Sequence, residues 1–204
     1  ESAFNNCTGL QRVQLPEGLT EIGQSAFSSC NRLSQITFPE SLTKIGGYAF
    51  NGCRRLLQIT LPEGLQTVEY NAFSGTGLTS LTIPEGLTSV GRGAFSSNRQ
   101  LISVTLKGRS AILQGGAFGG CPNLREVNGS DVKTVDGIVY SADGTQLVAL
   151  LSTVSGSIRL EQGITSIPFG FFQGNERITE VVIPTSISTI EGSSFTYCKN
   201  LKSV

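Results

Sequence analysis

The chain has 204 residues, and its 38% hydrophobic residues and 25 glycines supply enough material for a core, which excludes a disordered protein. Its 15 Lys and Arg residues balance 15 Asp and Glu residues, so the net charge gives no reason to expect nucleic-acid or membrane-surface binding. The absence of histidine removes Ser-His-Asp and Cys-His catalysis and every His-containing metal site. No apolar run approaches the roughly 20 residues of a membrane span, and the absence of methionine indicates a fragment of a longer chain or a processed chain.

An internal repeat runs through the whole chain. Phenylalanines that follow a small residue or another Phe recur every 23 residues, with one interval of 22 and one of 54. They are Phe4, Phe27, Phe50, Phe73, Phe95, Phe118, Phe172 and Phe195. A unit of this size is too small to bury its own apolar side, so copies must stack on one another. The sequence therefore predicts a repeat solenoid of about eight 23-residue coils that forms a single unit over residues 1–204.

The coil that begins at Leu33 illustrates the elements expected in each repeat. Leu33, Ile36 and Phe38 alternate with polar residues, which predicts a short strand. A proline then ends the strand, and a second short apolar stretch follows at 42–45. The segment around Phe50, with its small neighbours, is expected to form a short helical turn on the outer face.

One coil is 31 residues long instead of 23. It replaces the small-Phe segment with two β-rich runs separated by an Asp-Gly pair at Asp143, which is a strong hairpin signal. We expect a β-hairpin over 138–150, within an insertion of about 136–151, standing on or beside the outer face with Tyr140 on the added surface. A domain boundary at this point is the alternative, and the repeat phase resumes directly afterwards. A smaller departure lies at 107–110, where the Pro-Glu-Gly-Leu sequence is missing.

All five cysteines occupy one repeat position, three residues after the Phe. That position is filled by Cys7, Cys30, Cys53, Asn98, Cys121, Asn175 and Cys198. A small polar side chain can close a buried turn here by bonding to local backbone, and side chains in register point the same way rather than at each other. We therefore expect buried free thiols with a structural role. A metal site on the first three cysteines is the alternative, but no CxxC pair or fourth ligand accompanies them, and no cofactor is expected.

The polar positions of the predicted strands form the candidate binding surface, because solenoid curvature makes them a broad concave face. Basic residues precede several strands and glutamates follow them, so stacked coils should carry one basic and one acidic rim. The candidate protein-binding residues are Arg12, Arg32, Gln35, Arg54, Arg55, Gln58, Arg99, Glu126, Tyr140, Arg159 and Glu180. The rims either solvate two edges or orient a protein partner by charge complementarity. No aromatic platform for sugars or bases appears on the strand positions.

The order L-x-x-I-x-L-P-E-G-L-x-x-I-x-x-x-A-F-x-x-C resembles the BspA-like, or treponemal-type, leucine-rich repeat of bacterial and protist surface proteins. The resemblance covers essentially the whole chain and implies a leucine-rich-repeat solenoid with a parallel sheet of short strands on its concave face. It also implies that the protein is secreted or exposed on a cell surface. It also implies attachment as the function, with an adhesin segment that binds an extracellular-matrix or host plasma protein. It supplies no catalytic residues. A structural spacer is the alternative function, and an enzyme is disfavoured because the acids repeat along a ridge instead of converging in a pocket.

Overall fold

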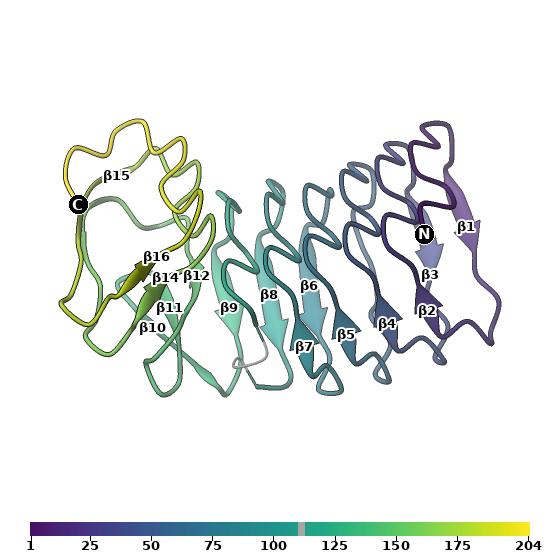
Figure 1. The fold of residues 1–204 in the computed structure, drawn as a ribbon, viewed down its shortest axis with the longest axis horizontal. Helices are drawn as coiled ribbons and strands as arrows, with labels where there is room; N and C mark the ends of the chain where they lie inside the picture. The colour runs from purple at the N-terminus through teal and green to yellow at the C-terminus, as the bar shows by residue number, and fades with distance from the viewer. Residues whose placement is uncertain (110–112) are drawn as a thin grey trace.

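The computed structural model describes residues 1–109 and 113–204. The chain forms a β-solenoid of about eight coils, with the first coils at one end of the molecule and the last at the other (Figure 1). A regular coil contains a strand, a second and shorter strand, and an outer turn around the repeated Phe, although residues 58–60 form no strand in their coil. The sequence departure at 107–110 falls partly outside the described residues, because Ser110 does.

The first strands of the coils pair in parallel, each with the strand one coil further along. They are β1 (Arg12–Gln14) with β3 (Gln35–Thr37), and β6 (Ser80–Ile83) with β8 (Ser103–Leu106) and β9 (Glu126–Asn128). Along β8, Val104 is fully buried while Thr105 beside it is exposed. The alternation confirms the predicted parallel strands, because successive side chains of a strand point to opposite faces.

The second strands form their own parallel sheet. It contains β2 (Glu21–Ile22), β4 (Lys44–Ile45), β5 (Thr67–Val68) and β7 (Ser89–Val90), and a bridge joins Val90 to Leu113. Each strand has only two residues, and its apolar member is buried. Lys44 Nζ lies 3.2 Å from Glu21 Oε1 and 3.0 Å from Glu69 Oε1, so an ion pair crosses three coils at the surface.

The outer segments are hydrogen-bonded turns, and the helical turns expected there are wrong: the described residues contain no helix. The amides of Ser25, Phe27 and Ser29 donate to carbonyls of the next coil at 2.8, 2.8 and 2.7 Å. Only the amides between them, on Ala26 and Ser28, donate to carbonyls three residues back. Ser25 and Ser29 also have left-handed φ angles of 55° and 61°. A helix cannot continue through such residues, and here alternate N–H groups bind the neighbouring coil instead.

The repeated phenylalanines form a stack through the core. From Phe4 to Phe118, ring centroids in adjacent coils are 5.0 to 5.9 Å apart and the rings are within 17° of parallel. Phe172 and Phe195 stack in the same way at 5.0 Å. Each inner ring is therefore covered by the coils on both sides of it, which no single coil could achieve.

The cysteines of the repeat bind the preceding coil through their thiols, and none of the five is in a disulfide. The Sγ atoms of Cys30, Cys53, Cys121 and Cys198 donate to the carbonyls of Phe4, Phe27, Phe95 and Phe172 at 3.1, 3.1, 3.4 and 3.0 Å. Asn98 Nδ2 donates in the same way to Phe73 O at 3.0 Å. The expected free thiols are thus confirmed, although the acceptor of each thiol belongs to the neighbouring coil. Asn98 also makes the expected bond to its local turn, from Nδ2 to Phe95 O at 2.8 Å.

Three residues at this repeat position depart from the pattern. Thr76 Oγ1 donates to Phe73 O of its own turn at 3.3 Å. Cys7 lies in the first coil and is exposed, and Cys198 is half-buried, so the expectation that all five thiols are buried is wrong for these two. Asn175 Oδ1 accepts from the amides of Arg177 and Ile178 at 2.8 and 3.0 Å. Asn175 therefore closes its own turn and makes no bond to the carbonyl of Phe118, the preceding repeated Phe, in the described chain.

The long coil contains a three-stranded antiparallel sheet of β10 (Val132–Val135), β11 (Ile138–Ser141) and β12 (Leu147–Leu150). β11 and β12 are the two strands expected from the hairpin signal, and β10 adds a third. Asp143 Oδ1 fixes the loop between them by accepting from the Ser141 hydroxyl and from the Thr145 amide and hydroxyl. These bonds to the charged form lower the pKa of Asp143.

The position of this sheet corrects the sequence-based expectation. All four residues of β11 are buried, and Tyr140 is among the largest fully buried side chains of the chain. Val139 belongs to the core cluster of the N-terminal coils, whereas Ile138 and Tyr140 belong to that of the C-terminal coils. The sheet therefore lies between two stacks rather than on the outer face. Its nearly continuous apolar runs are typical of strands covered on both faces.

The C-terminal coils have separate sheets. β13 (Gly156–Arg159) pairs with β15 (Ile178–Val182), and β14 (Ser166–Ile167) pairs with β16 (Thr189–Ile190). Among the described residues no pairing joins β9 to β13, so the strand sheet predicted to run along the whole solenoid is interrupted by the long coil.

Direct contacts also join the two stacks. Arg92 NH2 lies 2.9 Å from Glu191 Oε2, and its guanidinium lies 5.7 Å from the centre of the Phe169 ring. A Cβ on Gly116, whose φ is +69°, would lie 1.8 Å from the Phe169 carbonyl oxygen. The two stacks approach closely here because Gly116 carries no side chain.

We predict that Tyr140→Ala lowers the free energy of unfolding by about 3 to 5 kcal/mol, as much as Phe73→Ala, because both rings are fully buried. Chemical denaturation of the two variants measures the losses. Tyr197, which is 69% exposed, provides the control, and its replacement by Ala should change stability by less than about 0.5 kcal/mol. A loss at Tyr140 as small as the one at Tyr197 would show that this sheet is not part of the core.

We predict that a disulfide-exchange reagent modifies Cys7 at once in the native protein and leaves Cys30, Cys53 and Cys121 unmodified until the chain unfolds. Cys7 is exposed and the other three are buried. Burial raises the pKa of Cys53 and of Cys121 to about 12, so these thiols form almost no reactive thiolate near neutral pH. Mass spectrometry counts the modifications, and rapid labelling of Cys53 in the native state would contradict this account.

We also predict that stability falls in alkaline solution. The pKa of Cys53 and of Cys121 rises on folding from 9.0 to about 12, so the native state favours the protonated thiols. Their contribution is complete below pH 9 and is lost as the pH rises from 9 towards 12, by about 1.4 kcal/mol per thiol at pH 10. Denaturation at about pH 8 and pH 10 measures this loss. The double variant Cys53→Ala, Cys121→Ala should lose less than the wild type between the two conditions, and an equal loss would contradict the prediction.

Candidate functional site

The exposed polar side chains of the first strands form one surface, which we call the strand face. Gln14 and Thr37 are register partners on β1 and β3, and Thr82 and Thr105 are partners on β6 and β8. All four are exposed. The sequence-predicted residues that lie exposed on strand positions are Arg12, Gln35, Gln58, Glu126 and Arg159. The structure places Arg159 in the separate C-terminal sheet, so it does not share a continuous sheet with the others.

Two of the predicted surface residues are placed differently from expectation. Glu180 is half-buried on β15, and its Oε2 accepts a 2.6 Å hydrogen bond from the hydroxyl of Ser157 on β13. Tyr140 is fully buried, and its hydroxyl accepts from the Glu161 amide at 3.3 Å. Tyr140 therefore cannot contact a partner in this conformation. The apolar residues Ile138 and Val139 directly before it were the sequence signal for burial.

The two charged rims exist in the N-terminal stack. The basic rim consists of Arg32, Arg54, Arg55 and Arg99, and the acidic rim consists of Glu17, Glu40, Glu63 and Glu85. All eight residues are exposed. Within the part of the chain that the structure describes, none of the four arginines forms an ion pair, whereas Glu63 lies 2.7 Å from Lys107 Nζ. The arginines are therefore available to an acidic partner.

The strand ladder has a break that sequence reasoning did not predict. Residues 58–60 occupy the strand position of their coil, but in the described structure no backbone hydrogen bond joins them to β3 or to β6. A pocket of about 250 Å³ lies between them and β3, lined by Ile36, Thr37, Phe38, Glu40, Gln58, Ile59, Thr60 and Pro62. A wider hollow lined by Arg12, Gln14, Gln35 and Gln58, among others, continues from it over β1.

Two sequence features coincide with the break. Phe38 is the one aromatic side chain at a position that holds Leu or Ile in the other coils with this pattern, and its ring meets Phe50 edge-on at 5.7 Å and Phe73 at 6.4 Å. The following coil is one residue short before Leu78, and a Cβ on Gly77 would lie 2.3 Å from the carbonyl oxygen of Arg54. Both features are visible in the sequence.

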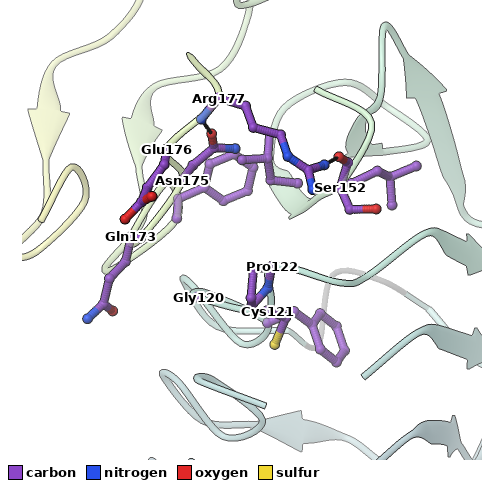
Figure 2. A pocket seen from close by; sticks show the side chains of 13 residues that line it. Gly120, Cys121, Pro122, Ser152, Gln173, Asn175, Glu176 and Arg177 are labelled. Carbon is purple, nitrogen blue, oxygen red and sulfur yellow. Dashed lines mark hydrogen bonds between the residues drawn. The ribbon is translucent and has the colours of Figure 1, made fainter. Parts of the chain in front are cut away.

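A second pocket, of about 310 Å³, lies where the two stacks meet, and we call it the seam pocket (Figure 2). It is lined by the turns at 118–122 and 171–177 and by 150–152. The guanidinium of Arg177 donates to the carbonyl oxygen of Ser152 on its wall. Asn175 makes no bond to the Phe118 carbonyl across this seam, unlike Cys53 and Asn98, which bond to the preceding coil.

The chemistry of the seam pocket does not favour catalysis. Burial raises the pKa of Cys121 to about 12, its Sγ bonds to the Phe95 carbonyl, and the sulfur is directed away from Arg177 (Figure 2). Glu176 lies 2.7 Å from Lys199 Nζ, which lowers the pKa of the carboxyl group, so it is a poor proton donor. The pocket thus lacks both an activated thiol and a carboxylic acid poised near neutral pH.

The described residues contain no cluster of three or more Cys, Asp or Glu side chains arranged to hold a metal ion. They also contain no helix of the length and apolarity that crossing a membrane requires.

The repeat matches a known sequence family. The BspA type leucine-rich repeat region matches in six copies, over residues 1–39, 27–143 and 151–204. No curated protein sequence matches the chain significantly.

Solved structures share the fold. A leucine-rich repeat protein of T. pallidum is 36% identical over 62% of this chain and 60% of its own, with a TM-score of 0.58, so the chain spans less than two thirds of that protein's length. A leucine-rich repeat protein of Eubacterium ventriosum has a TM-score of 0.77 at 19% identity, over 95% of this chain and 55% of its own. The pneumococcal vaccine antigen PcpA has a TM-score of 0.61 at 20% identity, over 95% and 60%. Since the family profile covers nearly the whole chain, the chain belongs to the BspA-type leucine-rich repeat family.

Proposed function

We propose that the chain is a protein-binding module that acts at the cell surface and recognises its partner through the strand face. The observation that carries the proposal is the basic rim, four exposed arginines without ion pairs beside an exposed polar strand surface. Arginine is enriched at interfaces, where its guanidinium pairs with carboxylates in a fixed geometry. A purely solvating edge has no need of four guanidinium groups on one side.

The chemistry of the face favours a protein over other ligands. The described strand positions carry Ser, Thr, Gln and charged residues, without the aromatic rings on which sugars and bases stack. The net charge of zero gives no general attraction to nucleic acid. Separate basic and acidic rims instead suit a partner with a complementary pair of charged edges, since such an arrangement fixes orientation and accelerates encounter.

An adhesin segment that binds an extracellular-matrix or host plasma protein is the specific form of this proposal. Membership of the BspA-type family supports a surface role, and the likeness to a pneumococcal vaccine antigen is consistent with it. A structural spacer is the second candidate. The regular Ser and Thr positions of β6 and β8 favour it, because a rod needs only β-propensity there and no particular recognition chemistry.

The test is a binding titration against a panel of purified matrix and plasma proteins. For a partner of the strand face, the quadruple variant Arg32→Glu, Arg54→Glu, Arg55→Glu, Arg99→Glu should lower the association rate by about tenfold or more, and added salt should lower the wild-type rate. The same four changes to Gln provide the graded control and should give an intermediate rate. Thermal stability should stay within a few degrees of wild type, because the four side chains are exposed. A partner that binds wild type and both variants at one rate would contradict use of the basic rim, and no partner across the panel would favour the spacer.

A further inference from the structure

The break in the strand ladder leaves unpaired backbone on the strand face of the N-terminal stack. β3 pairs with β1 on one side, and its other side faces residues 58–60 without a hydrogen bond in the described chain. An open strand edge presents a row of amide and carbonyl groups that another chain can pair with. The amide and carbonyl groups on this edge of β3 are therefore unpaired, whereas the equivalent groups of β6 and β8 are hydrogen-bonded to each other.

The opening is confined to the strand face. The second strands β4 and β5 pair across the same two coils, and the Phe50 amide bonds to the next coil at 2.7 Å on the outer side. The coils are thus held in place at two of their three sides. The two coils are therefore joined at their second strands and at their outer turns, and only their first-strand positions are unpaired.

The floor of the break is apolar and incompletely covered. Ile36 and Ile59 are only half-buried, whereas Leu81 and Val104, at the same repeat position, are 3% and 0% exposed. Both isoleucines line the pocket of about 250 Å³. A pocket of this size accommodates one or two apolar side chains, and such a side chain would complete the burial that the intact ladder gives elsewhere.

Charges of opposite sign lie beyond the two ends of the break. Arg54 and Arg55 precede residues 58–60, and Glu40 lies just after β3 and lines the pocket. An extended segment gains favourable contacts at both ends if it places a basic residue or its amino group near Glu40 and an acidic residue near the two arginines. A segment that runs antiparallel to β3 does so with a basic N-terminal half and an acidic C-terminal half.

We propose that this break is the binding site for an extended peptide segment of the protein partner, which adds to the sheet through main-chain hydrogen bonds and inserts an apolar side chain against Ile36 and Ile59. The inference rests on the proposed function of the strand face and gives it a definite recognition mode. Main-chain pairing supplies affinity in such complexes, and the pocket selects among side chains.

The experiment selects displayed random hexapeptides on the immobilised protein and measures the selected peptides, as synthetic copies, by titration. We expect alternating apolar residues, a basic N-terminal half and an acidic C-terminal half. Thr60→Arg, which fills the pocket, should weaken binding at least tenfold, and the matched Thr82→Arg on the intact part of the face should leave it unchanged. N-methylation of alternate peptide amides should abolish binding, because it removes main-chain donors and keeps the side chains.

Amide hydrogen exchange provides the second measurement. Bound peptide should slow the exchange of residues 58–60 and leave residues 103–105 unchanged. Selection of no peptide, or binding that resists both N-methylation and Thr60→Arg, would overturn the proposal. A protein partner that depends on the basic rim but not on Thr60 would overturn the peptide site alone and leave the strand face as the interface. Peptide binding in the absence of any rim-dependent partner would support the peptide site and contradict the role proposed for the basic rim.

Discussion

A coil of 23 residues cannot bury its apolar side or satisfy its backbone by itself, and every level of this structure follows from that constraint. The outer turns show it most directly. Alternate amides, such as those of Phe27 and Phe50, donate to the next coil, so the hydrogen bonding that would make a helix is used to join coils instead. The stacked Phe rings and the thiol bonds from Cys30 and Cys53 repeat the same solution in side chains.

The candidate binding features arise where this stacking is altered. The long coil inserts a buried sheet between two stacks, and the seam pocket lies where the stacks meet, where Asn175 makes no bond to the carbonyl of Phe118. Phe38 and the short coil before Leu78 coincide with an open strand ladder on one face, while the second strands hold the same coils together. A perfectly regular array would present only a uniform row of polar side chains, so its irregular coils are where it can be selective.

The cysteine of the seam pocket and the rim glutamates are structural and surface groups rather than catalytic ones. Cys121 lines a pocket, which by itself would make it a candidate nucleophile. Burial raises the pKa of its thiol to about 12, and its hydrogen bond to a backbone carbonyl uses the proton that a nucleophile must lose. The glutamates remain spread along a rim, as their fixed repeat phase requires, and they do not converge. Both observations direct functional interest to surfaces rather than to a catalytic centre.

The sequence by itself determined the period, the parallel strands, the Phe core and the structural role of the cysteine position, because each depends on residues that recur at one phase and meet their own copies. It also located the irregular coil from the spacing of Val127 and Ile158. Only the tertiary structure decided where that coil lies. Tyr140 is buried because a second stack of coils covers the far side of β11, and a repeat pattern contains no information about what covers an insertion. The outer turns were wrongly expected to be helical. Local propensity does not show which amides will donate hydrogen bonds to the carbonyl groups of a neighbouring coil. The ladder break was likewise missed because Phe38 satisfies the apolar pattern, and a repeat pattern does not show which neighbouring strands pair.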